Sequence, residues 1–258
     1  MEQTTQKKRV TGRTRDLVIA LDRGILGFAR SWLLVFNLFI LIFVGLPFLA
    51  PTLMKAGLIT PAAILYRMYG PPLCHQLAYR SWFLFGERPS YSRGVFEQYT
   101  GINPADFWAA RDFTGNPEMG YKVAYCERDI AIYGAILLGG LIYSLPFVRQ
   151  RLKPLHWLAW VLVGLLPIAL DGFSQLFSQM GIPPFNLIPF RESTPFLRTL
   201  TGGLFGLANV WLAYPYFQES MREVAHDLSV KLARAAPRAV RESTRESARE
   251  NTPPSEAD

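Results

Sequence analysis

Long runs without charged residues are the feature that most constrains this chain. Residues 32–53 contain no charged side chain, and residues 130–148, 157–182 and 196–217 are also predominantly apolar. A helix rises about 1.5 Å per residue, so a run of about 20 apolar residues spans the hydrocarbon core of a bilayer. A core helix of a soluble protein would carry a polar stripe instead. We therefore predict an all-α integral membrane bundle of about four transmembrane helices.

The segments outside these runs divide the chain further. Residues 1–31 form a basic segment in which apolar residues recur at helical spacing, namely Leu17, Leu21, Ile25 and Phe28. This pattern predicts an interfacial amphipathic helix over residues 14–30, with a plain extension of the first transmembrane helix as the alternative. Residues 58–69 are too short to span. After a transmembrane domain over residues 32–217, the polar tail 218–258 is expected to be largely disordered.

The distribution of basic residues predicts the orientation. The formal net charge is +7, and seven Lys and Arg residues lie in each of the segments 1–31 and 218–258. Three more lie in the loop between the second and third runs. By the positive-inside rule, both termini are cytoplasmic and region 54–129 faces outward. We expect a cell-membrane protein in contact with the lipid bilayer and with other membrane subunits as candidate partners; nucleic-acid binding is not expected.

The two cysteines, Cys74 and Cys126, both lie in the region expected to face outward. An oxidising outer compartment favours a disulfide between them. His75 and Asp129 are close to them in sequence, and thiolate, imidazole and carboxylate groups all bind divalent metals, so a metal site is a second interpretation. Two unpaired thiols are the third. No CxxC or HExxH motif narrows the choice.

Asp171 is an ionisable residue inside an apolar run. It lies 14 residues after Trp157, which is roughly 21 Å into a core of about 30 Å. Such a group is costly unless it is paired, hydrated or protonated. Gln175 lies one turn later on the same helix face. The candidate partners are Arg128, Arg191 and Arg198, in either a structural ion pair or a ligand site.

Several short motifs occur in an order that resembles a known family. They are Cys74-His75-Gln76, Arg80-Ser81-Trp82-Phe83, Cys126-Glu127-Arg128, Asp171-Gly172 with Gln175, Arg191, and Leu197-Arg198. Over residues 73–206 the chain resembles the uncharacterised prokaryotic membrane-protein family called domain of unknown function 2085. The family's CH…CxRC set looks like a metal or thiol site, and here Asp129 replaces its last cysteine. Residues 88–125 look like an insertion relative to the family.

These observations do not identify a reaction. The leading hypothesis is a multi-pass membrane protein, a transporter or an accessory subunit, whose polar site near the outer face binds a divalent metal or a small anionic ligand. The alternatives are a structural subunit of a larger membrane complex and a membrane enzyme that acts on a lipid or a disulfide. The sequence contains no P-loop, Rossmann glycine fingerprint or GxSxG motif, so no catalytic residue is assigned.

Overall fold

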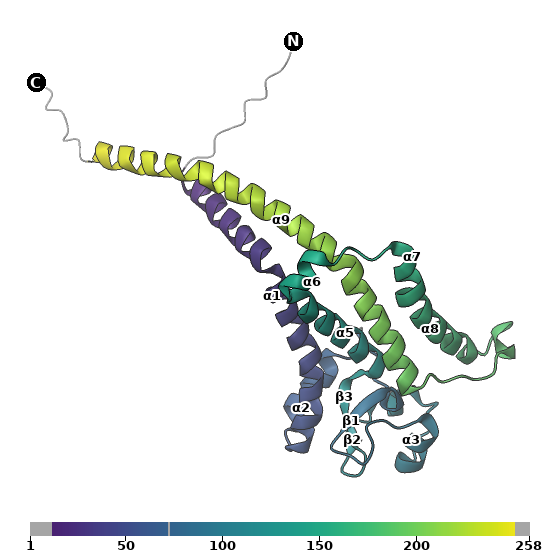
Figure 1. Cartoon of the computed structure of the whole chain (residues 1–258). Helices are drawn as coiled ribbons and strands as arrows, with labels where there is room; N and C mark the ends of the chain where they lie inside the picture. The colour runs from purple at the N-terminus through teal and green to yellow at the C-terminus, as the bar shows by residue number, and fades with distance from the viewer. Residues whose placement is uncertain (1–11, 72, 251–258) are drawn as a thin grey trace, which may run out of the picture. The chain divides into compact units, whose positions relative to one another are not determined.

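The computed structural model describes residues 12–71 and 73–250, and for residues 186 and 236–250 it describes the backbone alone. The chain is mostly helical (Figure 1). By its internal contacts it divides into two compact units. One unit is Phe36–Tyr216. The other combines Met1–Val35 with Phe217–Asp258.

The elements follow one another in an order that alternates long helices with short connecting structure. They are α1 (Arg13–Lys55), α2 (Ile59–Met68), η1 (Ala78–Arg80), β1 (Ser81–Leu84), α3 (Arg93–Thr100), α4 (Phe107–Asp112), β2 (Gly115–Asn116), β3 (Gly120–Cys126), α5 (Glu127–Ser144), α6 (Pro146–Arg151), α7 (Trp157–Ala159), η2 (Trp160–Leu165), α8 (Leu166–Gln179), η3 (Phe185–Leu187) and α9 (Pro195–Glu250).

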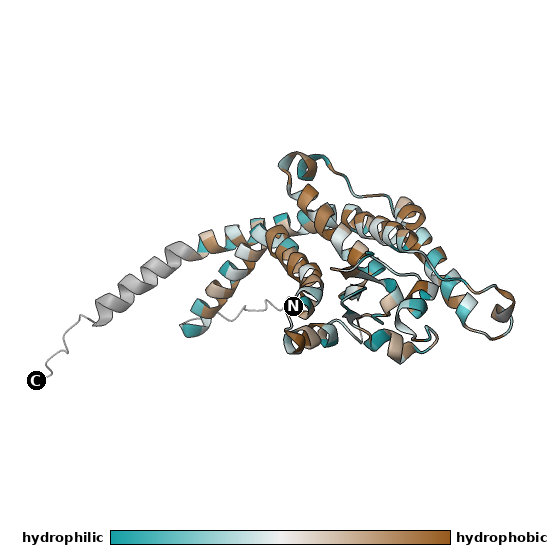
Figure 2. Ribbon diagram, turned by 90° about the horizontal axis from the view of Figure 1, so that it is seen from below, coloured by the Kyte–Doolittle hydropathy of each residue, from teal (hydrophilic) through white to brown (hydrophobic). Residues whose placement is uncertain are grey.

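Two helical segments among the described residues are long and apolar enough to cross a membrane: α1 and the continuous helix Trp157–Gln179. Hydrophobic residues are frequent in the helices (Figure 2), and many large apolar side chains of these two segments are exposed, as lipid-facing side chains are. By length, hydropathy and number of charged residues, α5 and α9 do not qualify as candidate membrane spans. The first turn of α5 carries Glu127, Arg128 and Asp129, and the apolar part of α9 is diluted by glycine and polar residues. The four predicted spans are therefore two candidate spans here.

The helix Trp157–Gln179 is irregular in its first half. Residues Trp160–Leu165 are π-helical, and Pro167 follows at the start of α8. Proline has no N–H to donate to the preceding turn, which explains why the regular α-helical hydrogen bonding is interrupted here. The helix continues beyond this point and carries Asp171 and Gln175 in its last turns, both buried.

Glycines allow α5 to pack closely against its neighbours. A Cβ atom at Gly206 of α9 would overlap the carbonyl oxygen of Ile132 and lie 2.8 Å from Ala135 Cβ, both in α5. A Cβ at Gly202 would lie 2.7 Å from the carbonyl oxygen of Arg128. Small residues at such crossings let helix backbones approach each other in membrane bundles. The contact fixes the first turn of α5 against the first turns of α9.

The region between α2 and α5 contains a small sheet that the all-α prediction did not include. Strand β3 pairs antiparallel with β1 on one side and β2 on the other. The segment contributes aromatic and apolar core residues, among them Tyr79, Phe83, Tyr91 and Phe96. Residues 88–125, which look like an insertion in the sequence, therefore build most of a separate hydrophobic core. Strand β1 contributes Phe83 to that core and pairs with β3, which leads into α5.

The second unit pairs the first part of α1 with the later part of α9. Lys231 Nζ lies 2.7 Å from Asp22 Oδ2, and the Trp32 ring stacks on Phe217 at 6.0 Å between centroids. The helix α1 begins at Arg13 and ends at Lys55, so residues 14–30 belong to the same helix as the first predicted span. The apolar residues Leu17 and Leu21 are exposed.

The tail differs from its prediction. The helix α9 continues to Glu250, where the polar composition predicts disorder. Alanine, arginine and glutamate are frequent there, and all three are strong helix formers. The remaining tail residues, 251–258, lie outside the described part of the chain, as do residues 1–11 at the start of the basic segment.

The α5–α9 contact can be tested with a matched pair of glycines one turn apart on α9. Gly206→Ala is expected to lower the free energy of unfolding by about 1–3 kcal/mol, because the added methyl group overpacks the contact. At Gly203 a Cβ would meet nothing within 4 Å, so Gly203→Ala should be neutral or slightly stabilising. Thermal melts of the purified variants in detergent measure both effects. Equal melting temperatures for the two variants would contradict the packing.

Candidate functional site

The start of α5 presents four chemically active side chains in sequence, Cys126 to Asp129. Successive residues of a helix point about 100° apart, so neighbouring side chains face different partners. Glu127 reaches Arg198 of α9, and Arg128 reaches Asp171 of α8. Cys126 and Asp129, three residues apart, share a face, and the Cys126 Sγ donates to Asp129 Oδ2 at 2.8 Å. One helical turn thereby connects two ion-pair clusters and the thiols.

The first cluster surrounds Asp171. Its carboxylate lies 2.6 Å from Arg128 Nη2 and 2.8 Å from Arg191 Nη2. The Ser193 hydroxyl donates to the same carboxylate at 2.7 Å. Asp171 is 5% exposed, so removal from water must be offset by these partners. Asp171 is therefore held as a fully paired carboxylate.

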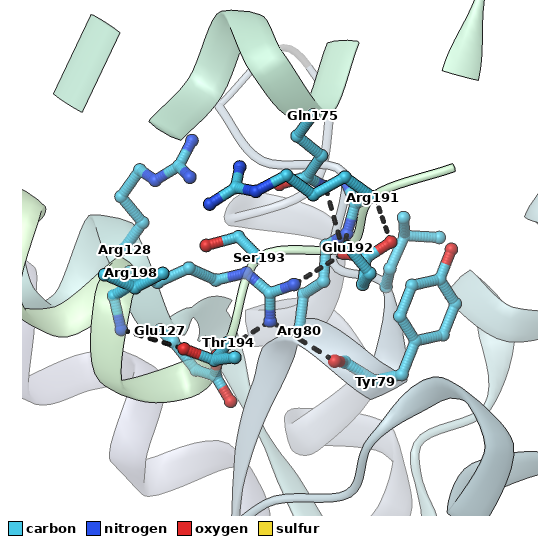
Figure 3. A network of polar contacts seen from close by, with 12 residues as sticks. Tyr79, Arg80, Glu127, Arg128, Gln175, Arg191, Glu192, Ser193, Thr194 and Arg198 are labelled. Atoms are coloured by element: carbon cyan, nitrogen blue, oxygen red, sulfur yellow. Dashed lines mark hydrogen bonds and ion pairs between the residues drawn. The ribbon is translucent and has the colours of Figure 1, made fainter. Parts of the chain in front are cut away.

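The second cluster joins Glu127 and Glu192 through arginines (Figure 3). Arg198 Nη1 lies 2.9 Å from Glu127 Oε2, and Arg198 Nη2 pairs with Glu192. Arg80 contacts both oxygens of Glu192, at 2.7 and 2.9 Å. The Gln175 amide donates to Glu192 at 2.9 Å. Glu192 thus links residues before β1 with α8 and α9.

The third group consists of two thiols and a carboxylate. The sulfur atoms of Cys74 and Cys126 and a carboxylate oxygen of Asp129 all lie within 4.8 Å of one another. Both cysteines are free thiols. A hydrogen bond with Cys74, together with burial and the charge of Asp129, raises the pKa of the Cys126 thiol above its usual range. This set of donor atoms is suited to a borderline-soft divalent metal.

A cavity of about 210 Å³ connects the thiol group with the arginines. Its wall includes Cys74, Cys126 and Asp129, together with Arg80, Arg128, Arg198 and Gln175. Glu127, Glu192 and Asp171, which anchor those arginines, are not among the described residues that line it. The surface of the cavity is therefore more basic than the cluster as a whole.

Hydrogen bonds from Gln76 and Lys122 fix the loop that carries Cys74. The Gln76 side chain donates to the carbonyl oxygens of Tyr66 and Ala124, and its backbone N–H donates to Cys74 Sγ at 3.3 Å. Lys122 Nζ donates to the Gln76 carbonyl at 2.9 Å and to that of Arg111. Burial lowers the pKa of Lys122 to about 7, although the nearby Asp112 opposes the shift. Strand β3 therefore positions both cysteines, one through its end and the other through Lys122.

The residues singled out in the sequence fall into these groups with two differences. Arg198 pairs with Glu127 and Glu192 and not with Asp171. His75 lines the cavity, but its ring packs against Phe107 at 5.9 Å between centroids, and it is not part of the close thiol–carboxylate group.

Several site residues were missed as functional candidates, among them Glu127, Lys122 and Glu192. Glu127 is fully buried and could have been suspected from its position beside Cys126 and Arg128. Lys122 is a charged residue flanked by apolar residues of β3, and such a position in the sequence indicates a buried charge. For Glu192, adjacent to Arg191 in a polar connection, no sequence pattern indicates burial.

Comparison with known proteins supports the family resemblance. Residues 118–212 match a family model described as "Predicted membrane protein (DUF2085)". The resemblance to DUF2085 is confirmed. An uncharacterized protein of Methanocaldococcus jannaschii is 28% identical over 158 residues, which is 60% of this chain and 69% of that protein. No solved structure matches the chain.

The DUF2085 match includes five of the eleven residues that line the cavity, the whole Asp171 cluster, and the Glu192 cluster except for Arg80. It contains Cys126, Arg128, Asp129, Asp171, Gln175, Arg191 and Arg198, whereas Cys74, His75 and Arg80 precede it. The comparisons attach a membrane location to the family and no activity.

The paired state of Asp171 predicts a graded effect of substitution. Asp171→Asn should lower the free energy of unfolding by about 2–4 kcal/mol, because Arg128 and Arg191 both lose their counter-charge. Asp171→Glu keeps the charge and should cost less. Denaturation in detergent measures both, with Asp227→Asn as a control because Asp227 is an exposed carboxylate on α9. An Asn variant as stable as the parent would show that the carboxylate is not needed there.

Proposed function

We propose that this chain is a four-span membrane protein that binds a divalent metal ion through Cys74, Cys126 and Asp129. The observation that carries the proposal is the convergence of these three donor atoms within 4.8 Å at the edge of a cavity. The residues come from distant parts of the chain, since Cys74 and Cys126 are 52 positions apart. Zn²⁺ is the metal class that two thiolates and a carboxylate suit best.

Charge balance also supports metal binding. A divalent ion that replaces two thiol protons leaves the net charge of the cavity unchanged. The carboxylate of Asp129 adds a negative charge, and Arg128 lines the same cavity. Three protein donors leave one position of a tetrahedral metal open, which is typical of zinc sites that exchange a ligand. The open position would face the cavity.

The four-span arrangement extends the two candidate spans to α5 and α9. Both helices pack against the apolar spans: Gly140 of α5 lies against Asn37 of α1, and Gly164 of η2 lies against Ala208 of α9. Both also expose large apolar residues, including Leu138 on α5 and Leu207 on α9. The 18 residues of α5 give a length of about 27 Å, close to the thickness of a bilayer core. The cavity then lies near the outer face.

Reporter fusions test the orientation. With four spans, a fusion after Asp258 should report the cytoplasm and an insertion within residues 88–125 should report the outside, because basic residues crowd both ends of the chain. A second fusion within residues 149–155, where three basic residues lie, serves as an internal cytoplasmic control. An outward-facing C-terminus would rule out an even number of spans with the N-terminus inside.

Metal titration tests the site. The full chain, purified in detergent under reducing conditions, should bind one Co²⁺ with a thiolate-to-metal absorption band and exchange it for Zn²⁺. Cys74→Ser and Cys126→Ser should abolish the band. Asp129→Asn should weaken binding by more than the roughly 10–100-fold that loss of an outer-shell partner costs. The control is Glu118→Gln, at an exposed carboxylate of the same region. Binding that is unchanged in the cysteine variants would contradict the proposal.

The closeness of the two sulfurs favours a disulfide as a second candidate state. An outer compartment is oxidising, and closing a loop of this size could be worth on the order of 4 kcal/mol. Thiol labelling of the denatured chain, with and without reductant, separates the two states because metal binding requires both sulfurs as thiolates. Labelling that appears only after reduction indicates the disulfide.

A further inference from the structure

The wall of the cavity carries three arginines in addition to the thiol group. Arg80, Arg128 and Arg198 contribute guanidinium groups, and Asp129 is the carboxylate among its described lining residues. Free water could hydrate these cations, but the arrangement is more specific than a hydrated surface. Each guanidinium forms an ion pair with a carboxylate that does not line the cavity: Glu192 pairs with Arg80 and Arg198, and Asp171 pairs with Arg128.

These anchors leave hydrogen-bonding capacity on the cavity side. A guanidinium has five N–H donors, and a carboxylate uses one or two of its three nitrogens here. Gln175 adds an amide to the same wall.

From this geometry we infer that the cavity binds a small oxyanion of the phosphate type on Arg80, Arg128 and Arg198, where it fills the open coordination position of the metal. The inference rests on the proposed metal site and names the ligand class of that site. Arginine forks match the oxygens of phosphate-like anions. A volume of about 210 Å³ admits a small anion or one headgroup phosphate. An anion between a metal and fixed guanidinium groups is neutralised from both sides.

Phosphate binding to the Co²⁺-loaded chain tests the inference. Inorganic phosphate should bind and change the cobalt absorption spectrum, because it replaces the fourth ligand. Arg80→Gln should raise the phosphate Kd at least about tenfold, because it removes one guanidinium group of the proposed anion pocket. Arg80→Lys keeps the charge and should recover part of the affinity. Arg88→Gln is the matched control, at an exposed arginine of the same region.

The outcomes separate this inference from the proposed metal site. Absence of phosphate binding, or equal Kd values for the parent and Arg80→Gln, would overturn the inference even if Co²⁺ binds. Absence of Co²⁺ binding refutes the proposed function. The anion pocket is then judged on the metal-free chain, where arginine-dependent phosphate binding supports it and its absence overturns it. A lipid headgroup is distinguished from free phosphate by measuring the phosphate Kd in nanodiscs of phosphatidic acid and in nanodiscs of phosphatidylcholine. If the ligand is a headgroup phosphate, phosphatidic acid competes and raises the Kd of inorganic phosphate. If the ligand is free phosphate, the two Kd values are equal.

Discussion

The carboxylate of Asp171 needs counter-charge because it is buried in an apolar helix, and this need organises the residues around it. Arg128 and Arg191 supply the charge, and Ser193 supplies a further hydrogen bond. The partnership with Arg128 fixes the first turn of α5 relative to α8. Since that turn also carries Cys126 and Asp129, a charge requirement in one helix determines where the thiol group lies.

The rest of the unit Phe36–Tyr216 holds that turn from its other sides. Close packing at Gly202 and Gly206 places α9 directly against α5, which brings Arg198 within reach of the fully buried Glu127. Strand β3 delivers Cys126 to the helix start, and Gln76 fixes the loop of Cys74. A site held by both packing and ion pairs has little freedom to relax, which is what preorganised binding of a metal and an anion requires.

The sequence predicts part of this arrangement. A lone charge in an apolar run marks Asp171, and this pattern is local. Cys126 and Asp129 are also close in sequence, whereas Cys74 lies 52 positions before Cys126 and only the fold brings it to them. Arg198 was a candidate partner of Asp171 because it lies near the predicted outer boundary, but it pairs with Glu127 and Glu192, since its partners depend on how α9 rotates against α5. Glu192 lies in a polar connection where nothing local indicates burial. The short strand β1 forms only by pairing with β3, more than 30 residues later, and was missed for that reason.

The central claim is that the two cysteines and Asp129 hold one metal ion at the edge of the cavity. X-ray absorption of the zinc-loaded full chain tests it most directly, because the scattering atoms around the metal are identified by their distances. With Cys74, Cys126 and Asp129 as ligands, we expect two sulfur neighbours at about 2.3 Å together with oxygen or nitrogen neighbours at about 2.0–2.2 Å. A shell of oxygen and nitrogen alone, or the same spectrum from a chain with Cys74→Ser and Cys126→Ser, would contradict it.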